Sequence, residues 1–417
     1  MPENFHIDMP EAVRNIIHTI EEHGFKAYAV GGCIRDSILG RNPDDWDITT
    51  SAVPSQIKTF FKRTVDTGIA HGTVTIMIDK TGYEVTTYRI DGEYEDGRHP
   101  KSVEFSDRLV DDLCRRDFTI NAMAYNDTDG FVDEFKGLDD LDAKIIRCVG
   151  EPELRFTEDA LRMMRAIRFS AQLGFTINEA TWSAIKKLAP SISKISMERV
   201  HVELGKTLMS AHPDYVAEYS EAGLFEPILP VVDNALKSRY NKKILAILRH
   251  VPDNIYLRYA ALFITSTPDE AAKTLRALKL DNKTVDTVSK LVELSKIDIE
   301  ETEPAVRTAL NKYGRDFLPL WHELMMAVLQ ASEDIIGISN PAKVKHLLTL
   351  KRLATDILAR GDCFTIKDLD ISGNDLIEYG LQGHEIGETL KSLLDIVIEN
   401  PKLNDKATLI AMIEHIK

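Results

Sequence analysis

The stretch AVGGCIRDSILGRNPDDWDITTS, from Ala29 to Ser51, constrains the fold of this chain more than any other. Apolar residues predict a buried strand over 25–30, and a diglycine separates it from a short helix over 33–39. A second strand is predicted over 46–50, after an exposed loop. A strand, a tight turn, a helix and a second strand predict a small unit of mixed α and β structure.

The same stretch carries two kinds of polar group. Asp45 and Asp47 are two residues apart, so strand geometry directs both carboxylates to one side. Two close like charges are unfavourable without a cation, and open carboxylates suit Mg²⁺. Gly31 and Gly32 let backbone N–H groups approach an anion at the helix start, near Arg35. The stretch therefore predicts a triphosphate site beside a metal site. A two-metal site would lower the pKa of an attacking hydroxyl and stabilise a pyrophosphate leaving group.

Two β-rich runs over 72–79 and 83–89 predict a hairpin, with Thr81-Gly82 as its tight turn. Alternation in the second run leaves Glu84 able to face the aspartate pair. Glu84 is the candidate third carboxylate, and a plain strand surface residue is the alternative interpretation.

The run RRDFTINAMAY contains Arg116, Asp117 and Asn121, in a helix predicted over 113–125. A helix N-terminus with Asp117 near the cap is the structural interpretation. Its place in the same small unit as the aspartates favours a functional one. In that interpretation Arg116 binds phosphate, and Asp117 or Asn121 binds ribose hydroxyls.

A third cluster, RFTEDALRMMRAIR, predicts a helix that begins at Thr157 and has a buried apolar stripe. Asp159, Arg162, Arg165 and Arg168 recur at every third residue. Three residues turn about 300° around the helix axis, so each step falls about 60° short of a full turn. Asp159 and Arg162 are therefore neighbours on the helix surface, while Arg168 lies half a turn away from Asp159. A surface helix whose charges match the dipole is the structural alternative.

The Asp159–Arg162 pair has a specific chemical meaning. Cytosine and adenine each present an amino donor beside a ring-nitrogen acceptor, and uracil and guanine present the reverse order. A carboxylate that accepts and a guanidinium that only donates match C and A, and leave unmatched groups against U and G. Such a pair predicts selection of C and A without a nucleic-acid template. Arg168 would instead back the helix or hold phosphate.

Composition and charge bound the remaining possibilities. A chain of 417 residues predicts two to four domains, and from Leu138 onward almost every segment reads as helical. Arg199 and Glu203 are interpreted as an i,i+4 pair within one of these helices. No apolar run predicts a membrane span, and the scattered cysteines fit a reducing cytoplasm. The net charge of −15 by itself disfavours nucleic-acid binding, because phosphate binding usually needs a basic surface. Basic runs over 237–249 and 343–360 nevertheless allow an extended anionic partner.

Taken together, the motifs of this sequence resemble those of a known family. In order, GGCIRD, DDWDITTSA, AHGTVTI, EVTTYRIDG, RRDFTINAMA, RFTEDALRMMRAIRF and ISMERVHVEL resemble the signature motifs of bacterial class II tRNA nucleotidyltransferases, the CCA-adding enzymes of the nucleotidyltransferase and poly(A) polymerase superfamily. The match is close over 24–204; beyond it only length and helicity agree.

The resemblance implies an α+β fold shaped like a seahorse. Its parts would be a catalytic nucleotidyltransferase head with a small mixed sheet over 1–139, then an all-α neck for base recognition over 140–210, a body over 211–310 and a tRNA-binding tail over 311–417. A polar loop over 91–101 resembles the family's flexible loop for the final A, with Arg98 as its working residue.

The resemblance also implies an activity: sequential addition of C, C and A to tRNA 3′ ends from CTP and ATP, with Mg²⁺ on Asp45 and Asp47. It implies triphosphate contacts from Gly32 and Arg35, and nucleotide contacts from Arg116, Asp159, Arg162, Arg165 and Arg168. The expected partners are the tRNA 3′ end and its acceptor and elbow region, without DNA or membrane, in the cytoplasm, as a monomer or homodimer.

Bacterial poly(A) polymerase is the nearest alternative, and a CC-only tRNA nucleotidyltransferase is the next. The AHGTVTI strand and the lack of a strongly basic C-terminal extension count against poly(A) polymerase. Small-molecule nucleotidyltransferases would lack the Asp159–Arg162 helix. A non-catalytic RNA-binding relative would be expected to lose one carboxylate of the pair.

Overall fold

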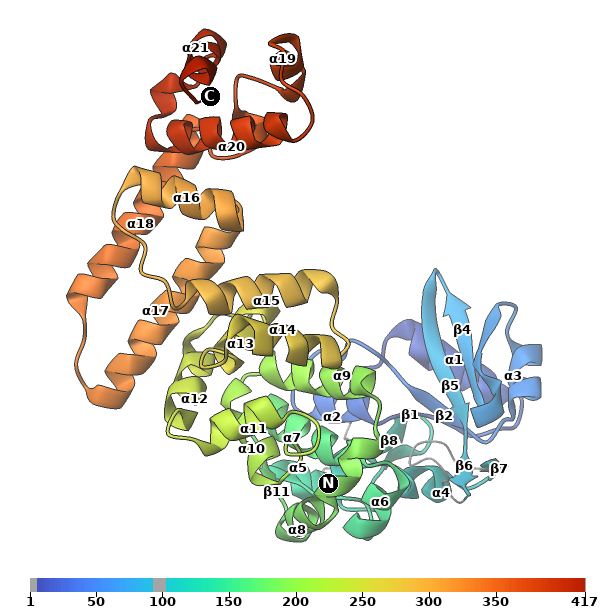
Figure 1. Ribbon diagram of the computed structural model, residues 1–417. Helices are drawn as coiled ribbons and strands as arrows, with labels where there is room; N and C mark the ends of the chain where they lie inside the picture. Colours follow the sequence, from blue (N-terminus) through green and yellow to red (C-terminus); the bar gives the residue numbers. More distant parts are fainter. Residues whose placement is uncertain (1–5, 93–102, 417) are drawn as a thin grey trace. The chain divides into compact units, whose positions relative to one another are not determined.

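The computed structural model describes residues 6–92 and 103–416 of the chain (Figure 1). The chain forms two compact units, Met1–Pro230 and Val231–Lys417. The first contains all the strands among the described residues, and the second is helical in its described part. A mixed sheet followed by helices confirms the predicted α+β class, while the finer division into four domains stays a prediction.

A seven-stranded sheet forms the centre of the first unit, in the order β3-β4-β5-β2-β1-β8-β9. β2 is parallel to β5 and every other neighbouring pair is antiparallel, so the sheet is mixed as predicted. Its strands are β1 Ala27–Val30, β2 Ile48–Thr50, β3 Thr64–Gly68, β4 Thr73–Ile78, β5 Thr81–Thr87, β8 Ala124–Asn126 and β9 Gly130–Val132. Two small two-stranded sheets pair β6 Arg89–Asp91 with β7 Val103–Phe105, and β10 Ile145–Ile146 with β11 Thr176–Ile177.

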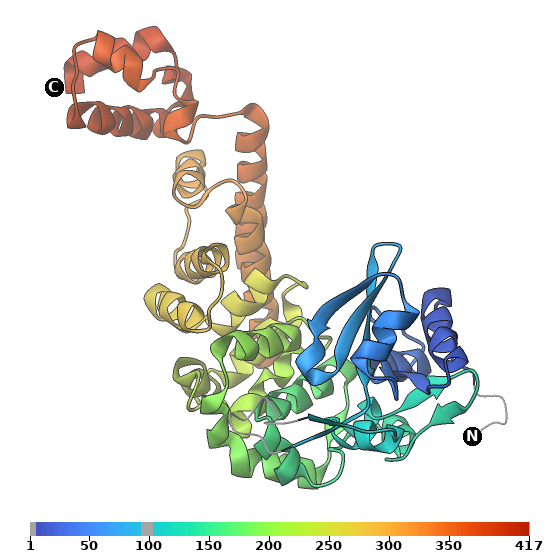
Figure 2. The ribbon, with the colours of Figure 1, turned by 90° about the vertical axis from the view of Figure 1, so that its right-hand side faces the viewer.

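The predicted hairpin is confirmed as β4 and β5, which project from the sheet in Figure 2. Its turn was placed wrongly. Thr81 pairs with Ile78 inside the ladder, and Asp79 and Lys80 make the turn with φ of 46° and 73°. Two successive positive φ angles are those of a type I′ turn, which matches the twist of the strands. Gly82 is therefore a strand residue.

The helices of the first unit pack on and beside the sheet (Figure 1). Apolar residues at 13, 16, 17 and 20 predict a helix over 9–23 that ends at Gly24, and α1 confirms it with all four of these residues buried. The helices are α1 Glu11–Glu22, α2 Gly32–Ile38, α3 Pro54–Phe60, α4 Leu109–Cys114, α5 Gly137–Asp142, α6 Pro152–Glu158, α7 Leu161–Leu173, α8 Glu179–Leu188, α9 Met197–Leu208 and α10 Val216–Glu221, with 3₁₀ turns at Ile69–His71, Thr119–Asn121, Ala189–Lys194 and Pro213–Tyr215.

One buried apolar cluster contains residues of the sheet and residues of the segments that follow it. Tyr28 and Val30 of β1 pack with Tyr88, Leu113 and Val149 in one buried apolar cluster. This cluster joins the sheet to the link between α4 and β8, where three of the predicted site residues lie. The position of that link is therefore determined by burial of apolar side chains on both sides of it.

The second unit is a succession of helices in which α17 packs along α12 and α18 (Figure 1). α11 Pro230–Lys237 begins at the last residue of the first unit. The helices that follow are α12 Asn241–His250, α13 Ile255–Leu262, α14 Pro268–Ala277, α15 Asn282–Leu294, α16 Glu303–Tyr313, α17 Phe317–Ile336, α18 Pro341–Arg360, α19 Gly373–Glu378, α20 His384–Glu399 and α21 Lys406–Ile416, with 3₁₀ turns at Ile366–Asp368 and Pro401–Leu403. Within the described residues, no helix combines the length and apolar character that crossing a membrane requires.

Candidate active site

The two aspartates of the opening stretch lie on the extended segment that leads into β2. The strand was expected over 46–50, but it begins at Ile48, so both aspartates precede it. Asp47 is nevertheless held to the sheet, because its carbonyl accepts a hydrogen bond from the backbone N–H of Val30 at 3.0 Å. Ile48 pairs with Val85 in the parallel ladder. Asp47 and Glu84 are the residues just before this pair, so the predicted third carboxylate lies beside the aspartate.

The three carboxylates influence one another electrostatically. Partial burial raises the pKa of Asp47, Arg116 opposes that shift, and the negative charge of Asp45 adds to it. Partial burial also raises the pKa of Glu84, and the charges of Asp47 and Asp45 add to that effect. Both side chains keep an exposed edge. A cation beside them would relieve this mutual repulsion.

The donor set fits a divalent metal that takes part of its coordination from outside the protein. Among residues 6–92 and 103–416, no three His, Cys, Asp or Glu side chains form a ready-made metal cage. Mg²⁺ is commonly held by one or two carboxylates, with water and substrate phosphates as its other ligands. Asp45 and Asp47, with open space on one side, match that requirement.

The diglycine lies directly against Arg116. Gly31 precedes α2 with φ of +86°, and a Cβ atom there would come within 2.9 Å of Arg116 Nη1. Arg116 Nη2 also donates to the fully buried Asp112 at 3.1 Å, while its buried Nε has no acceptor among the described residues. The absence of a side chain at Gly31 is what allows the guanidinium to approach the backbone.

The helix predicted over 113–125 is wrong. α4 ends at Cys114; a β-bridge from Phe118 to Cys148, a 3₁₀ turn over Thr119–Asn121 and then β8 follow. The backbone of this link is bonded to residues far along the chain: Thr119 N donates to Arg147 O at 2.9 Å, and Val149 N donates to Asp117 O at 3.2 Å. These tertiary bonds override the local helical pattern.

Asp117 is the centre of a buried polar network on this link. Arg165 Nε donates to its Oδ2 at 2.7 Å and Asn121 Nδ2 donates to its Oδ1 at 3.1 Å. Although burial disfavours the charge, Arg165 and Asn121 hold the pKa of Asp117 well below its usual range. Asn121 Oδ1 in turn accepts from Arg35 Nη1 at 2.5 Å, and Arg35 also binds Asp36. Arg35 is thus buried behind the diglycine, and several of its donors are already engaged.

Asp159 was expected within a helix that begins at Thr157, and this expectation is wrong. α6 ends at Glu158 and α7 begins at Leu161, so Asp159 lies at the break between them with extended backbone. Its Oδ1 accepts from Leu161 N at 3.0 Å. An aspartate that binds the backbone near a helix start favours such a break, which explains why the three-residue spacing does not place Asp159 on the stripe of α7.

Asp159 and Arg162 are each held by another partner. Arg199 of α9 donates to both carboxylate oxygens of Asp159, at 2.7 and 3.2 Å. Arg162 donates to Glu158 at 2.6 Å and to the carbonyl of Arg115 at 2.9 Å. Both predicted base-reading groups are therefore oriented by ion pairs that do not join them to each other.

Arg165 and Arg168 turn toward Glu203 of α9. Arg168 Nε donates to Glu203 at 2.5 Å, and Arg165 lies 4.0 Å from the same carboxylate. The guanidinium of Arg168 lies 3.8 Å from the ring centre of Phe169, which Arg165 and Arg35 also approach, at 5.4 and 5.0 Å. Arg168 is thus held between α7 and α9, and its two predicted roles, backing the helix or holding phosphate, stay predictions.

Sequence reasoning missed the role of α9. Arg199 and Glu203 were expected to pair with each other, but they bind Asp159 and Arg168 across the α7–α9 packing. Asp112, which holds Arg115 and Arg116, was also missed. Its spacing of four residues from Arg116 was a signal available in the sequence, whereas nothing local indicated the α9 contacts. Arg98 and residues 93–102 lie outside the described residues.

Three family models match the chain in succession. They are the poly A polymerase head domain over residues 27–147, the RNA and SrmB-binding site of polymerase A over 174–236, and tRNA nucleotidyltransferase domain 2 over 254–413.

Curated relatives match along the whole chain. The CCA-adding enzyme of Levilactobacillus brevis is 36% identical over 99% of this chain and 98% of its own length. That of Latilactobacillus sakei subsp. sakei is 38% identical, over 91% of each chain.

The fold is similar to solved structures of the same name. The Bacillus stearothermophilus CCA-adding enzyme in complex with CTP matches with a TM-score of 0.75 and 32% identity, over 97% of this chain and 96% of that one. The Thermotoga maritima CCA-adding enzyme complexed with tRNA matches in fold with a TM-score of 0.61 at 21% identity, over 99% and 97% of the chains.

Proposed function

This chain belongs to the CCA-adding enzymes, a family of nucleotidyltransferases, and from that premise we propose that it adds C, C and A in sequence to the 3′ end of tRNA. The proposed donors are CTP and ATP, pyrophosphate is the released product, and no nucleic-acid template takes part. The similar Bacillus stearothermophilus enzyme, solved in complex with CTP, supports CTP as one donor.

One observation carries the proposal: electrostatic interactions, hydrogen bonds and a short stretch of backbone connect the carboxylate cluster to the residues proposed to read the base. Arg116 interacts with Asp47 and lies against Gly31. The next residue, Asp117, binds Arg165 of α7. Arg162 lies on the same helix, and Asp159 lies just before it. One short link would therefore connect the proposed phosphate site to the proposed base site, as positioned nucleotidyl transfer requires.

Asp45 and Asp47 would hold Mg²⁺, with Glu84 as the supporting carboxylate beside them. Mg²⁺ bound there would lower the pKa of the attacking 3′ hydroxyl and offset the negative charge of the leaving pyrophosphate, in the two-metal manner. The Arg116 guanidinium, whose Nη1 lies beside Gly31, would donate to a phosphate oxygen at the diglycine.

Asp117 and Asn121 remain candidates for the ribose, and their present contacts suit a positioning role. Asp117 already accepts from Arg165 and Asn121, and Asn121 accepts from Arg35. These bonds would keep Arg35 and Arg165 in place when a charged triphosphate arrives. Arg168, which is bound to Glu203 and packed on Phe169, would support Arg35 and Arg165.

Base selection would rest on Asp159 as acceptor and Arg162 as donor. The amino group and ring nitrogen of cytosine or adenine would satisfy both, and uracil or guanine would leave both unmatched. The ion pairs with Arg199 and Glu158 hold the two side chains in place without using all their hydrogen-bonding capacity.

Poly(A) polymerase and CC-only activity remain the alternatives. The head-domain family model carries the poly A polymerase name, but the relatives that match along the whole chain are CCA-adding enzymes.

The test is an extension assay on a tRNA that ends at the discriminator base, with Mg²⁺ and with each nucleotide alone and in mixture. We expect two C with CTP alone, C, C and A with CTP and ATP together, and no further product. A long A ladder would support poly(A) polymerase, and CC without A would support a CC-only enzyme.

A further inference from the structure

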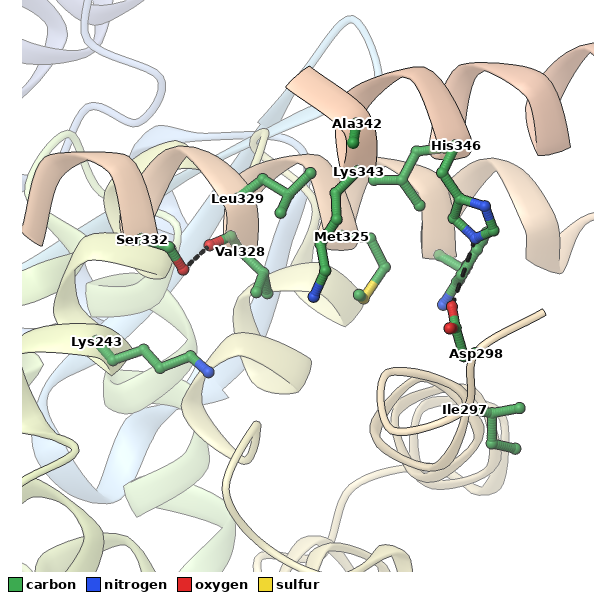
Figure 3. A pocket seen from close by; sticks show the side chains of 12 residues that line it. Lys243, Ile297, Asp298, Met325, Val328, Leu329, Ser332, Ala342, Lys343 and His346 are labelled. Atoms are coloured by element: carbon green, nitrogen blue, oxygen red, sulfur yellow. Dashed lines mark hydrogen bonds and ion pairs between the residues drawn. The ribbon is translucent and has the colours of Figure 1, made fainter. Parts of the chain in front are cut away.

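The second unit contains a cavity of about 390 Å³ that the proposed chemistry does not use (Figure 3). It lies between α12, α17 and α18, and the segment after α15 closes one end. The volume is within the range of small-molecule sites, roughly 300–1,000 Å³. The two basic runs of the sequence, over 237–249 and 343–360, lie on the helices that flank it.

One wall of the cavity is apolar. Met325, Val328 and Leu329 follow one another on one face of α17, and all three are only partly buried. Trp321 continues the same face at its buried end. Partly exposed apolar side chains that line a cavity of this size offer a flat contact for a planar, weakly polar group such as a nucleobase.

Two lysines point into the same space. Lys243 of α12 and Lys343 of α18 extend toward the cavity from two different helices (Figure 3). Neither forms an ion pair with another described residue, whereas Lys237, Lys290 and Lys312 of the same unit each bind a carboxylate at 2.7–2.8 Å. Two convergent, unneutralised ammonium groups in a chain of net charge −15 favour an anionic occupant.

His346, one helical turn after Lys343 on α18, brings hydrogen-bonding groups to the cavity. Its ring lies 3.5 Å from Asp298 (Figure 3) and 2.8 Å from Glu301, and both carboxylates come from the segment after α15. The cavity thus combines two ammonium groups, an apolar wall and a set of hydrogen-bonding groups. A nucleotide needs these three kinds of contact, for its phosphate, its planar ring and its polar base edge.

We propose that this cavity binds one nucleotide of the RNA substrate, turned out of its stack, with its phosphate on Lys243 and Lys343 and its base against Met325, Val328 and Leu329. The inference rests on the proposed function, which supplies an RNA partner. Single-stranded or unstacked nucleotides are the form of RNA that proteins hold in this way. A free nucleotide has the same chemistry, so the test must separate the two sources.

The first measurement is the affinity of the full chain for tRNA lacking its CCA end, by fluorescence anisotropy at several salt concentrations. K243A/K343A should bind roughly tenfold more weakly at physiological salt and lower the salt slope by about one. K243R/K343R should keep most of the affinity. K242A/K345A is the matched control, because it removes the neighbouring charges of the same helices, which lie outside the cavity lining.

The second measurement concerns the base. M325A/L329A should weaken tRNA binding by roughly tenfold without changing the salt slope, because it removes apolar contact area and no charge. At saturating tRNA both cavity variants should extend tRNA at the rate of the unmodified chain, with only the KM for tRNA raised.

Three results separate the possibilities. Equal losses in K243A/K343A and K242A/K345A, or no loss in either, would overturn the inference while leaving CCA addition intact. Free AMP or CMP that binds the unmodified chain but not K243A/K343A, with unchanged tRNA affinity, would assign the cavity to a free nucleotide instead. A chain that fails to extend tRNA at all would refute the proposed function itself.

Discussion

At the scale of single residues, the most informative contact joins Arg199 to Asp159. Two hydrogen bonds from one guanidinium fix the plane of the carboxylate, which is the group proposed to accept from the amino group of C or A. Arg199 touches no reacting atom, so its proposed role is to position Asp159 and thereby to keep base choice strict.

Replacing Arg199 by Met should therefore relax base choice. We expect incorporation of U and G, relative to C and A, to rise about tenfold, because Asp159 loses its fixed orientation. Arg199→Lys should restore part of the strictness. Arg147→Met, which breaks a pair with Asp140, is the control and should leave base choice unchanged. Lower melting temperature with unaltered base choice in Arg199→Met would show a merely structural role.

Metal binding at the carboxylate cluster can be tested without measuring nucleotide addition. Mg²⁺ should raise the melting temperature of the chain, because a ligand that binds only the folded state stabilises it. Asp45→Asn should abolish that rise and lower nucleotide addition by at least roughly a hundredfold. Asp44→Asn changes the adjacent exposed aspartate and should retain both properties. A full Mg²⁺ response in Asp45→Asn would contradict the assignment of the metal.

At the scale of elements, the start of α2 depends on a glycine for two separate reasons. Gly31 has positive φ, and any side chain there would displace Arg116. Gly40, just after α2, also has positive φ but has open space around its Cα. Gly40 therefore serves as a positive-φ control at which a side chain would meet no neighbour.

Gly40→Ala should lose about 1 kcal/mol of folding stability because of its positive φ. Gly31→Ala should lose roughly 2–3 kcal/mol, because Gly31 combines φ of 86° with ψ of −127°, a conformation that residues other than glycine rarely adopt. Only Gly31→Ala should also lose most of its activity, because its Cβ pushes the guanidinium away from the proposed phosphate position. Denaturant unfolding and the extension assay measure the two effects. Equal activity in the two variants would exclude a role for Arg116 beside the diglycine.

α10 carries a carboxyl group whose ionisation opposes folding. Burial, with the charges of Glu221 and Asp214, raises the pKa of Glu218 from 4.5 to about 7. Below pH 4.5 the group is protonated in both states and costs nothing. Between pH 4.5 and 7 the unfolded state loses the proton first, so the folded state is progressively destabilised, and above pH 7 the cost is complete.

Glu218→Gln should accordingly be more stable than the unmodified chain at pH 8, by about 1–2 kcal/mol, and nearly equal to it at pH 4.5. Glu323→Gln, at an exposed position on α17, should show no such trend. Denaturant unfolding across pH 4.5–8 checks both variants, and a constant difference for Glu218→Gln would contradict the prediction.

At the scale of the whole molecule, the chain is two compact units, each with its own core. In the second unit Arg307 is 2% exposed and joins three segments. Its Nε donates to the carbonyl of Ile398 at 2.7 Å, and its Nη1 pairs with Glu303 and Asp362. A buried arginine with these partners ties α16 to the end of α20.

Arg307→Met should destabilise the second unit by roughly 3 kcal/mol, the loss expected when one partner of a buried charge network is removed. Arg352→Met removes an exposed arginine paired at 3.3 Å and should cost under about 1 kcal/mol. Denaturant unfolding distinguishes them. Base choice should be unchanged in both, since neither residue belongs to the candidate site.

The sequence by itself determined the chemical groups and much of their local order. The spacing of Asp45 and Asp47, the diglycine and the apolar stripes of α1 and the β4–β5 hairpin all depend on neighbours a few residues away, so local periodicity reports them. The motif order also identified the family, which the full-length relatives confirm.

Only the tertiary structure decided how those groups are held. The pairs Asp117–Arg165 and Asp159–Arg199 join residues 48 and 40 positions apart. The helix predicted over 113–125 gave way to backbone bonds with residues 147–149. Local patterns show which side chains are buried or charged, but they do not show which distant backbone group or counter-charge a residue meets. That choice depends on packing, and packing is what joined the proposed chemistry to the proposed base choice.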